Sequence, residues 1–388
     1  MKYIDEFRDP EKARLLVRQI RALEPCIPFL HERPVVLMEF CGGHTHTIFR
    51  YGIEQLLPNW IELVHGPGCP VCVLPTGRVD DCVALARRPE VIFATFGDAM
   101  RVPGSEKSLL QAKADGADIR MVYSPLDALQ LARANPKRQL IFFALGFETT
   151  MPSTALTILQ AEAQGIDNFC VFCNHITTPP IVKALLDEPN MRIDGFIAPG
   201  HVSMVIGEQP LRFVAEQYQR PIVITGFEPL DVLQSIWMLL EQMARGYCAL
   251  ENQYVRVVPP GGNAAGLEAI HKIYEVREFF EWRGLGSIGQ SGVRIRKAYA
   301  PFDAERRFDV PNLQVTDPKA CQCGEVLKGS IRPWQCQLFG EDCTPESPMG
   351  ALMVSSEGAC AAYYNYSDVQ GLLQRREIES QEKTRWSA

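Results

Sequence analysis

The sequence predicts an α/β protein with two similar doubly wound parallel-sheet domains and a smaller, cysteine-rich C-terminal domain. Short apolar runs alternate with helical patterns, and they form two successive sets of about four strand–helix units each. Beyond residue 250 this alternation stops, and five cysteines fall between residues 321 and 360. We therefore expect domains at residues 1–137, 138–250 and 251–374, followed by a disordered tail at 375–388.

The expected strands are apolar, and helical patterns lie between them. In the first set the strands cover residues 35–40, 61–64, 91–96 and 119–123, and in the second set residues 140–145, 169–173, 195–198 and 222–225. Because ligands of doubly wound sheets bind beyond the carboxyl ends of the strands, the residues at those ends are candidates for a site. They are Cys41, the region of Cys69, Asp98, Glu148, His175, His201 and Glu228.

Composition and charge exclude several classes of protein. The chain has 388 residues, 46% of them hydrophobic, and a net charge of −7 with scattered lysines and arginines, so we expect no binding to nucleic acid. No apolar run reaches the roughly 18 residues of a membrane span, and the N-terminal helix capped by Asp9 and Pro10 is too polar for a signal peptide. A cytoplasmic location follows. Because thiols stay reduced there, the 13 cysteines favour metal binding or redox chemistry over structural disulfides.

The first stretch with clear chemical potential is residues 39–46, Glu-Phe-Cys-Gly-Gly-His-Thr-His. The pattern places Cys41 on a turn between a strand and a helix, where the positive helix end favours thiolate over thiol. The two following glycines allow a ligand to approach closely. Cys41 is therefore a candidate nucleophile or metal ligand. The alternative is a cysteine that packs as a small hydrophobic residue, with His44 and His46 as capping residues.

The second such stretch is residues 65–72, His-Gly-Pro-Gly-Cys-Pro-Val-Cys. Cys69 and Cys72 are three residues apart in a turn, so they can form a disulfide or chelate a metal. A structural zinc site would need a second pair. The other Cys-x-x-Cys, Cys170 and Cys173, lies in an expected strand whose side chains alternate between faces, so we interpret those two as core residues. Three other cysteines receive the same interpretation: Cys26, Cys82 and Cys248.

The C-terminal cysteines are Cys321, Cys323, Cys336, Cys343 and Cys360, and no histidine lies among them. A ligand set made only of thiolates selects zinc or an iron–sulfur cluster. Their spacing matches neither a zinc ribbon nor the bacterial ferredoxin sequence. A four-iron cluster is the favoured prediction, and zinc remains the alternative.

Four long motifs, at residues 39–46, 65–72, 146–150 and 336–364, resemble those of the HypD family of hydrogenase maturation factors. The resemblance extends to about residue 369. It implies an iron–sulfur scaffold that, with a small partner called HypC, holds the iron on which the Fe(CN)2CO group of [NiFe]-hydrogenases is built. It also implies that HypE supplies cyanide and that the hydrogenase large subunit is served indirectly. Such a protein is a redox-active assembly scaffold rather than a conventional turnover enzyme.

The resemblance also implies roles for individual residues. Cys41 would bind the iron together with HypC, Cys69 and Cys72 would form a redox-active pair, and the C-terminal cysteines would hold a [4Fe-4S] cluster. From the chemistry of the site we further expect that His44 accepts a proton or orients the iron's ligands, with capping as the alternative. Among the C-terminal cysteines we expect Cys323, Cys336, Cys343 and Cys360 as the ligands and Cys321 as the spare, because cysteines one residue apart seldom reach one cluster together.

One position departs from the family pattern. Leu352 stands where many relatives have a cysteine, so a cysteine there is not an indispensable cluster ligand. A function of another class also remains open, namely a free-standing iron–sulfur thiol–disulfide reductase that uses the same pair and cluster, with Cys41 as the attacking thiol.

Overall fold

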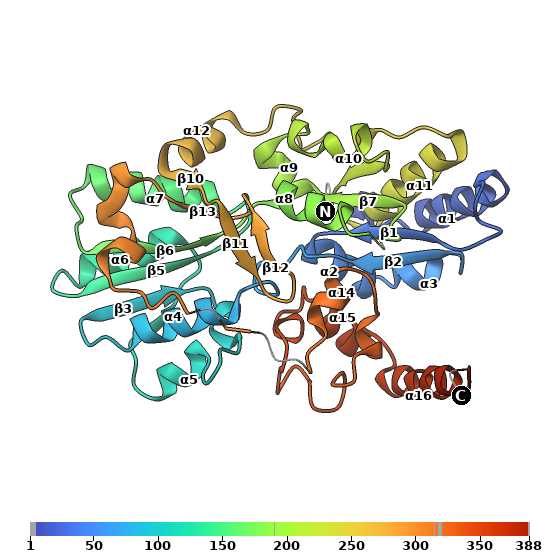
Figure 1. Cartoon of the computed structure of the whole chain (residues 1–388). Coiled ribbons are helices and arrows are strands. Elements are labelled where there is room, and N and C mark those ends of the chain that lie inside the picture. The colour runs from blue at the N-terminus through green and yellow to red at the C-terminus, as the bar shows by residue number, and fades with distance from the viewer. Residues whose placement is uncertain (1–4, 190, 314, 317–319, 387–388) are drawn as a thin grey trace. The chain divides into compact units, whose positions relative to one another are not determined.

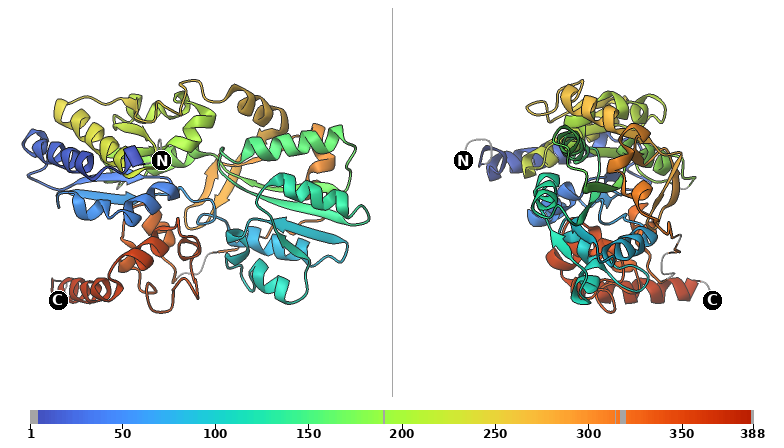
Figure 2. Two further views of the ribbon diagram at one scale, coloured as in Figure 1. Left: turned by 180° about the vertical axis from the view of Figure 1, so that it is seen from behind. Right: turned by 90° about the vertical axis from the view of Figure 1, so that its left-hand side faces the viewer.

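The computed structural model describes residues 5–189, 191–313, 315–316 and 320–386 (Figure 1). Its chain forms two compact units, each made of separate segments. Unit 1 combines Met1–Cys69, Leu185–Pro260 and Lys319–Ala388, and unit 2 combines Pro70–Ala184 and Gly261–Pro318. Helices flank the sheet of each unit, as Figure 2 shows from two further sides.

Unit 1 contains a five-stranded parallel sheet in the order β2-β1-β7-β8-β9. The strands are β1 (Val35–Glu39), β2 (Ile61–His65), β7 (Gly195–Pro199), β8 (Ile222–Thr225) and β9 (Leu250–Asn252). The helices are α1 (Pro10–Ala22), α2 (Gly42–Arg50), α3 (Ile53–Leu56), α9 (Gly200–Ile206), α10 (Phe213–Glu216) and α11 (Pro229–Arg245). The strands β7 and β8 are buried at every residue, which is typical of a parallel sheet covered on both faces.

The helix α1 begins where the sequence predicts. The side chain of Asp9 accepts hydrogen bonds from the backbone N–H groups of Glu11 and Lys12, and Pro10 is the first helical residue. Ile20 is fully buried in a core that it shares with Leu37 of β1 and Ile236 of α11. The apolar face of α1 is therefore what attaches this helix to unit 1.

The C-terminal segment of unit 1 consists mainly of turns and short helices. It contains α14 (Cys323–Leu327), α15 (Ala359–Tyr366) and α16 (Val369–Trp386). Helix α15 packs against α2, close to the carboxyl ends of β1 and β2 (Figure 1). Short 3-10 turns occur throughout the chain, at Asp5–Phe7, Glu24–Cys26, Asp98–Arg101, Gln209–Leu211, Lys297–Phe302, Pro333–Gln335 and Ala351–Met353.

Unit 2 contains a four-stranded parallel sheet in the order β4-β3-β5-β6. The strands are β3 (Val91–Thr95), β4 (Ile119–Met121), β5 (Gln139–Gly146) and β6 (Phe169–His175). Helices α4 and α7 lie on opposite faces of this sheet (Figure 1). The unit's helices are α4 (Thr76–Ala86), α5 (Leu109–Ala114), α6 (Pro125–Ala134), α7 (Met151–Ala163), most of α8 (Thr178–Leu186), α12 (Ala264–Ile273) and α13 (Ala304–Arg307).

Two antiparallel ribbons complete unit 2. One pairs β10 (Tyr274–Val276) with β13 (Val293–Ile295), and the other pairs β11 (Phe279–Trp282) with β12 (Gly286–Gly289). Tyr274, Val293 and Ile295 belong to the same apolar core as Phe142 of β5 and Val171 of β6. Strands β10 and β13 therefore contribute to the core of this unit.

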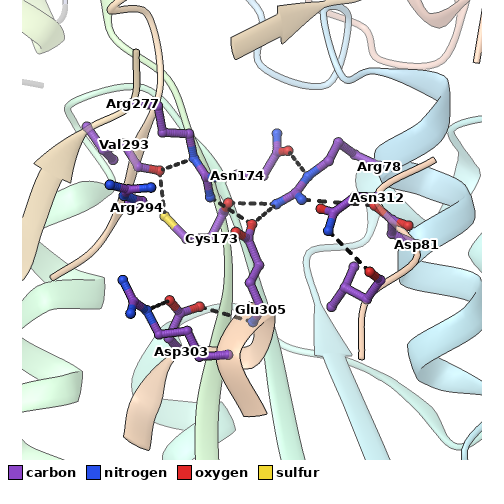
Figure 3. A network of polar contacts seen from close by, with 12 residues as sticks. Arg78, Asp81, Cys173, Asn174, Arg277, Val293, Arg294, Asp303, Glu305 and Asn312 are labelled. Carbon is purple, nitrogen blue, oxygen red and sulfur yellow. Dashed lines mark hydrogen bonds and ion pairs between the residues drawn. The ribbon is translucent and has the colours of Figure 1, made fainter. Parts of the chain in front are cut away.

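A buried polar network joins these later residues to α4 (Figure 3). One carboxylate oxygen of Glu305 accepts hydrogen bonds from Arg78, at 2.6 Å, and from Arg277, at 2.7 Å. Arg78 also donates to the backbone carbonyl of Cys173 in β6, and its guanidinium lies over the ring of Phe172. Burial opposes ionisation of Glu305, but the two guanidiniums outweigh it and lower the pKa of that carboxyl.

The α/β class with parallel-sheet domains is confirmed, but the grouping of the strands is corrected. Strands at 35–40 and 61–64 lie in the same sheet as those at 195–198 and 222–225, whereas the four strands between them in sequence form the other sheet. A boundary at 137/138 therefore does not separate the sheets, and residues 251–374 are divided between both units. Order along the chain does not decide which strands share hydrogen bonds.

The expected disordered tail is also corrected for residues 375–386, which belong to α16. Arg375 and Glu379 form an ion pair one helical turn apart, which supports this helix. Residues 387 and 388 lie outside the described part of the chain. Within that part, no helix is both long and apolar enough to cross a membrane.

Candidate metal centre

Cys41 lies on the turn that the sequence predicts. Strand β1 ends at Glu39, α2 begins at Gly42, and Cys41 is the N-cap residue with an extended backbone. A Cβ atom on Gly42 would lie 2.5 Å from the Cβ of Glu357, and one on Gly43 would lie 3.0 Å from the ring of Phe227. The two glycines are therefore needed because other parts of unit 1 approach the turn closely.

The thiol of Cys41 is only 2% exposed and lies 3.6 Å from Nδ1 of His201. Burial and the negative charge of Glu39 raise the pKa of this thiol well above its ordinary value. The backbone N–H groups of His44 and Gly43 act in the opposite direction but are too weak to reverse the shift. The prediction that the helix end would favour thiolate is therefore wrong, because desolvation outweighs the helix end.

His44 lies inside unit 1 and does not cap α2. Its Nε2 lies 3.0 Å from the backbone carbonyl oxygen of Gly226, which can only accept, so Nε2 must carry the proton. The ring stacks on Phe227 at a centroid distance of 4.7 Å, and burial lowers the pKa of His44. A neutral imidazole with an unprotonated Nδ1 results. That Nδ1 has no hydrogen-bond partner among the described residues.

His201, one of the candidates predicted at the strand ends, is the neighbour of the Cys41 thiol. It follows the carboxyl end of β7, in the first turn of α9, and its ring lies against Phe227 at 5.1 Å. Burial and the neighbouring His44 lower the pKa of His201 to about 4, so its imidazole is neutral at pH 7. Its position after a parallel strand was the available signal, but the strand order that brings it to Cys41 was not predicted.

His65 ends β2 and is buried beside Glu39. Its Nδ1 lies 2.7 Å from Oε1 of Glu39, and its Nε2 lies 3.8 Å from a carboxylate oxygen of Glu54. Burial would lower the pKa of His65, but the two carboxylates raise it to about 9. The Glu39–His65 pair is therefore an ion pair inside unit 1.

The loop that carries Cys69 touches the backbone of Cys41. A Cβ atom on Gly68 would lie 2.2 Å from the backbone nitrogen of Cys41, so only glycine fits at this position. Cys69 is 4% exposed and is the last residue of unit 1, whereas Cys72 is fully buried in unit 2. Neither forms a disulfide, and their redox pairing stays a prediction.

The five C-terminal cysteines line one cavity of unit 1. Its lining residues are Cys321, Gln322, Cys323, Val326, Cys336, Leu338, Phe339, Cys343, Gly350, Met353 and Cys360. The sulfur atoms of Cys321 and Cys323 are 3.0 Å apart. Cys321 is the most exposed of the five cysteines. The structure therefore brings the four predicted cluster ligands and the predicted spare, Cys321, to the same cavity.

The surroundings of this cavity fit an iron–sulfur cluster. The backbone N–H groups of Gly350 and Met349 face the Cys343 sulfur and act to lower its pKa, although burial raises that pKa overall. Among the described residues, no three His, Cys, Asp or Glu side chains converge on a point where a single metal ion would be held. Thiolates of a four-iron cluster bind different irons and need not converge in this way. Leu352, at the position that departs from the family pattern, is buried and does not line the cavity.

The remaining cysteines divide into two groups. Cys82, Cys170 and Cys173 are buried, as the sequence predicts. Cys26 and Cys248 are exposed, so their assignment to the core is wrong. Cys26 lies in a 3-10 turn after α1, and Cys248 lies in the connection after α11, where its thiol donates to the backbone carbonyl of Gln219.

Comparison with known proteins gives one consistent result. The HypD family model, described as the hydrogenase formation hypA family, matches residues 11–367. A hydrogenase maturation factor HypD from Rhodobacter capsulatus is 60% identical over 370 residues, which cover 94% of this chain and 98% of the relative. The HypD of Escherichia coli is 54% identical over 366 residues, and a HypD2 of Bradyrhizobium diazoefficiens is 52% identical over 384 residues; these cover 94% and 97% of this chain and 98% and 100% of the relatives. The chain therefore belongs to the HypD family, and its function is hydrogenase maturation.

Proposed function

We propose that this chain is the scaffold on which, together with HypC, the Fe(CN)2CO group of [NiFe]-hydrogenases is assembled. The observation that carries this proposal is the environment of Cys41, whose buried thiol lies 3.6 Å from the neutral imidazole of His201 on a turn that other parts of unit 1 approach closely. The iron is the cargo of this site. HypE would deliver cyanide, and the hydrogenase large subunit would receive the completed group indirectly.

Cys41 would hold the iron through its sulfur. Cyanide and carbon monoxide favour low-spin iron(II), and a thiolate is a suitable soft ligand for that ion. Because burial keeps the thiol protonated, iron binding must release its proton. Nδ1 of His201, at 3.6 Å, is close enough to receive that proton, and Nδ1 of the neutral His44 is a further buried acceptor in unit 1.

Cys69 and Cys72 would supply electrons. Attaching the cyanide formed on HypE requires two electrons, and two thiols provide both as they form a disulfide. Oxidation of Cys69 and Cys72 to a disulfide releases two electrons and two protons, and both pass to the group on HypE that carries the cyanide. The pair must then be reduced again before another cyanide is processed.

Cys323, Cys336, Cys343 and Cys360 would hold a [4Fe-4S] cluster, which supplies single electrons when bound. The chain itself provides the cavity, the sulfur ligands and the backbone N–H groups that face them. Gly350 leaves the space that the sulfurs of Cys321 and Cys323 occupy. Cys321 remains the spare in this proposal.

Infrared spectroscopy tests this function. The chain co-purified with HypC should show bands of iron-bound cyanide and carbon monoxide, and Cys41→Ala should lose them while keeping its iron–sulfur absorbance. Cys82→Ala is the matched control, because it also removes a buried thiol but lies on α4, in unit 2. Bands of normal intensity in Cys41→Ala would show that the iron is held elsewhere. Turnover of a dithiol substrate without any partner would instead favour the reductase.

A further inference from the structure

We propose that Glu39 is a positioning residue, whose buried carboxylate fixes the Cys41 turn and the Cys69 loop relative to each other. Neither Glu39 nor His65 has a role in the function proposed above. The inference depends on the proposed function only for its predicted effect on iron assembly. The contacts that support it lie within unit 1.

The two residues occupy equivalent places on neighbouring strands. Glu39 ends β1, His65 ends β2, and they are direct partners in the parallel register. Their side chains form the ion pair of 2.7 Å described above, and the Glu39 side chain is fully buried. Cys41 follows Glu39 by two residues, and the Gly66-Pro67-Gly68-Cys69 loop follows His65 directly. The ion pair therefore joins the starting points of both cysteine-bearing segments.

The same carboxylate also holds the turn on its other side. Its Oε2 accepts a hydrogen bond of 2.7 Å from the backbone N–H of Cys41, and its Oε1 accepts one from the hydroxyl of Thr45 in α2. Three donors from three places in the fold thus converge on one carboxylate: the Cys41 backbone, the first turns of α2 and the end of β2. A carboxylate can accept all three because it offers only acceptor sites.

The backbone around this carboxylate leaves little room for independent movement. The N–H of Gly66 donates to the carbonyl of Glu39 at 2.7 Å, and the N–H of Gly42 lies 3.4 Å from the carbonyl oxygen of Gly68. Gly68 is packed against the Cys41 backbone so closely that it has no space for a Cβ atom. A shift of the Cys69 loop would therefore be transmitted to the Cys41 turn.

Glu39→Gln is the informative substitution because it keeps the size of the side chain but removes its charge. If the amide oxygen accepts from the Cys41 N–H, the NH2 group faces His65 and Thr45, which must then accept instead of donate, and the ion pair with His65 is lost. Asp194→Asn is a matched control. Asp194 is also a buried carboxylate of unit 1 that accepts a backbone N–H, that of Val36 at 2.9 Å, and pairs with a cation, Arg33. It lies at the opposite end of β1, away from the cysteines.

Hydrogen exchange measured by mass spectrometry on the full chain provides the test. Glu39→Gln should increase exchange at least tenfold in both the 40–45 and 66–69 segments, whereas Asp194→Asn should leave both within twofold. If Glu39→Gln does not fold, His65→Gln removes the other partner of the ion pair and should loosen the same two segments. The proposal is overturned if only one segment responds, if neither does, or if the control variant loosens both equally.

The consequence for assembly is measured separately. In the complex with HypC, the cyanide bands of Glu39→Gln should fall at least tenfold, and those of Asp194→Asn should stay within twofold of the unmodified chain. Absence of these bands from the unmodified chain would contradict the proposed function, but the exchange result would still decide whether Glu39 couples the two segments. Exchange that loosens as expected while the bands keep full intensity would contradict the positioning role.

Discussion

Gly350 lies so close to Cys323 that a Cβ atom built on the glycine would be only 2.6 Å from the cysteine sulfur, and equally close to that of Cys321. Real Cβ atoms do not approach other atoms so closely. The backbone at Gly350 therefore forms one wall of the cavity that the five C-terminal cysteines line.

We predict that Gly350→Ala reduces the iron–sulfur content of the purified chain by more than half. The added methyl group must displace two sulfur atoms from their positions, and a cluster needs its thiolates at fixed distances. Iron analysis and the brown absorbance of anaerobically purified protein provide the measurement. Gly261→Ala is the control, because nothing lies within 4 Å of the position of its Cβ atom. Unchanged iron content in Gly350→Ala would contradict the cluster site.

A second prediction separates the two neighbouring cysteines. Cys321→Ala should keep the brown chromophore, because Cys321 is the more exposed and is the proposed spare, whereas Cys323→Ala should lose it. The reverse result would exchange their roles. Stoichiometric zinc instead of iron in anaerobically purified protein would rule out the cluster.

A third prediction concerns the Cys-x-x-Cys pair. Cys69→Ser and Cys72→Ser should each keep the fold and the iron–sulfur absorbance but abolish hydrogenase maturation, because a single thiol cannot form the disulfide that releases two electrons. Hydrogenase activity in cells that carry each variant is the measurement. Cys26→Ser, which changes an exposed cysteine, is the control. Normal maturation in both pair variants would rule out the redox role.

A fourth prediction concerns the stability of unit 2. Glu305→Ala should lower the free energy of unfolding by roughly 3–5 kcal/mol, because Arg78 and Arg277 would keep their buried charges without their shared carboxylate. Urea denaturation measures this difference. The control is Glu62→Ala, which breaks a more exposed pair with Arg332 and should cost about 0–1 kcal/mol. Equal losses would mean that the network in Figure 3 contributes no more than a surface pair.

A fifth prediction concerns pH. Burial lowers the pKa of His175 to about 4, from an ordinary value of 6.5. Between these values the unfolded chain binds a proton that the folded chain does not, so stability should fall as the pH decreases from about 6.5 to about 4. The contribution of this one group is roughly 3 kcal/mol.

The His175→Gln variant isolates that contribution. The difference in unfolding free energy between the unmodified chain and this variant should change with pH by that amount, even though other buried histidines also titrate. His31→Gln, which alters an exposed histidine, is the control for replacing a histidine by glutamine. A constant difference for His175→Gln across this range would show that its imidazole is not held neutral in the fold.

The local features of this protein follow from residues that are close together in the sequence. The strand, turn and helix around Cys41 follow from a short apolar run, two glycines and a helical pattern, and the structure places Cys41 at the N-cap of α2 as predicted. The Asp9 cap and the strand position of Cys170 and Cys173 were predictable for the same reason. Each of these features depends on residues close together in the sequence, whose preferences for strand, turn or helix are local.

Only the tertiary structure decided which distant segments meet. It brings His201 to Cys41 and Glu39 to His65, because β1 pairs with β7 on one side and with β2 on the other. It also reverses the expected pKa shift of Cys41, since the helix end acts locally whereas desolvation depends on every segment that covers the thiol. The exposure of Cys26 and Cys248 has the same origin. Burial is a property of what the rest of the chain places around a residue, and the residue's own neighbours in sequence do not determine it.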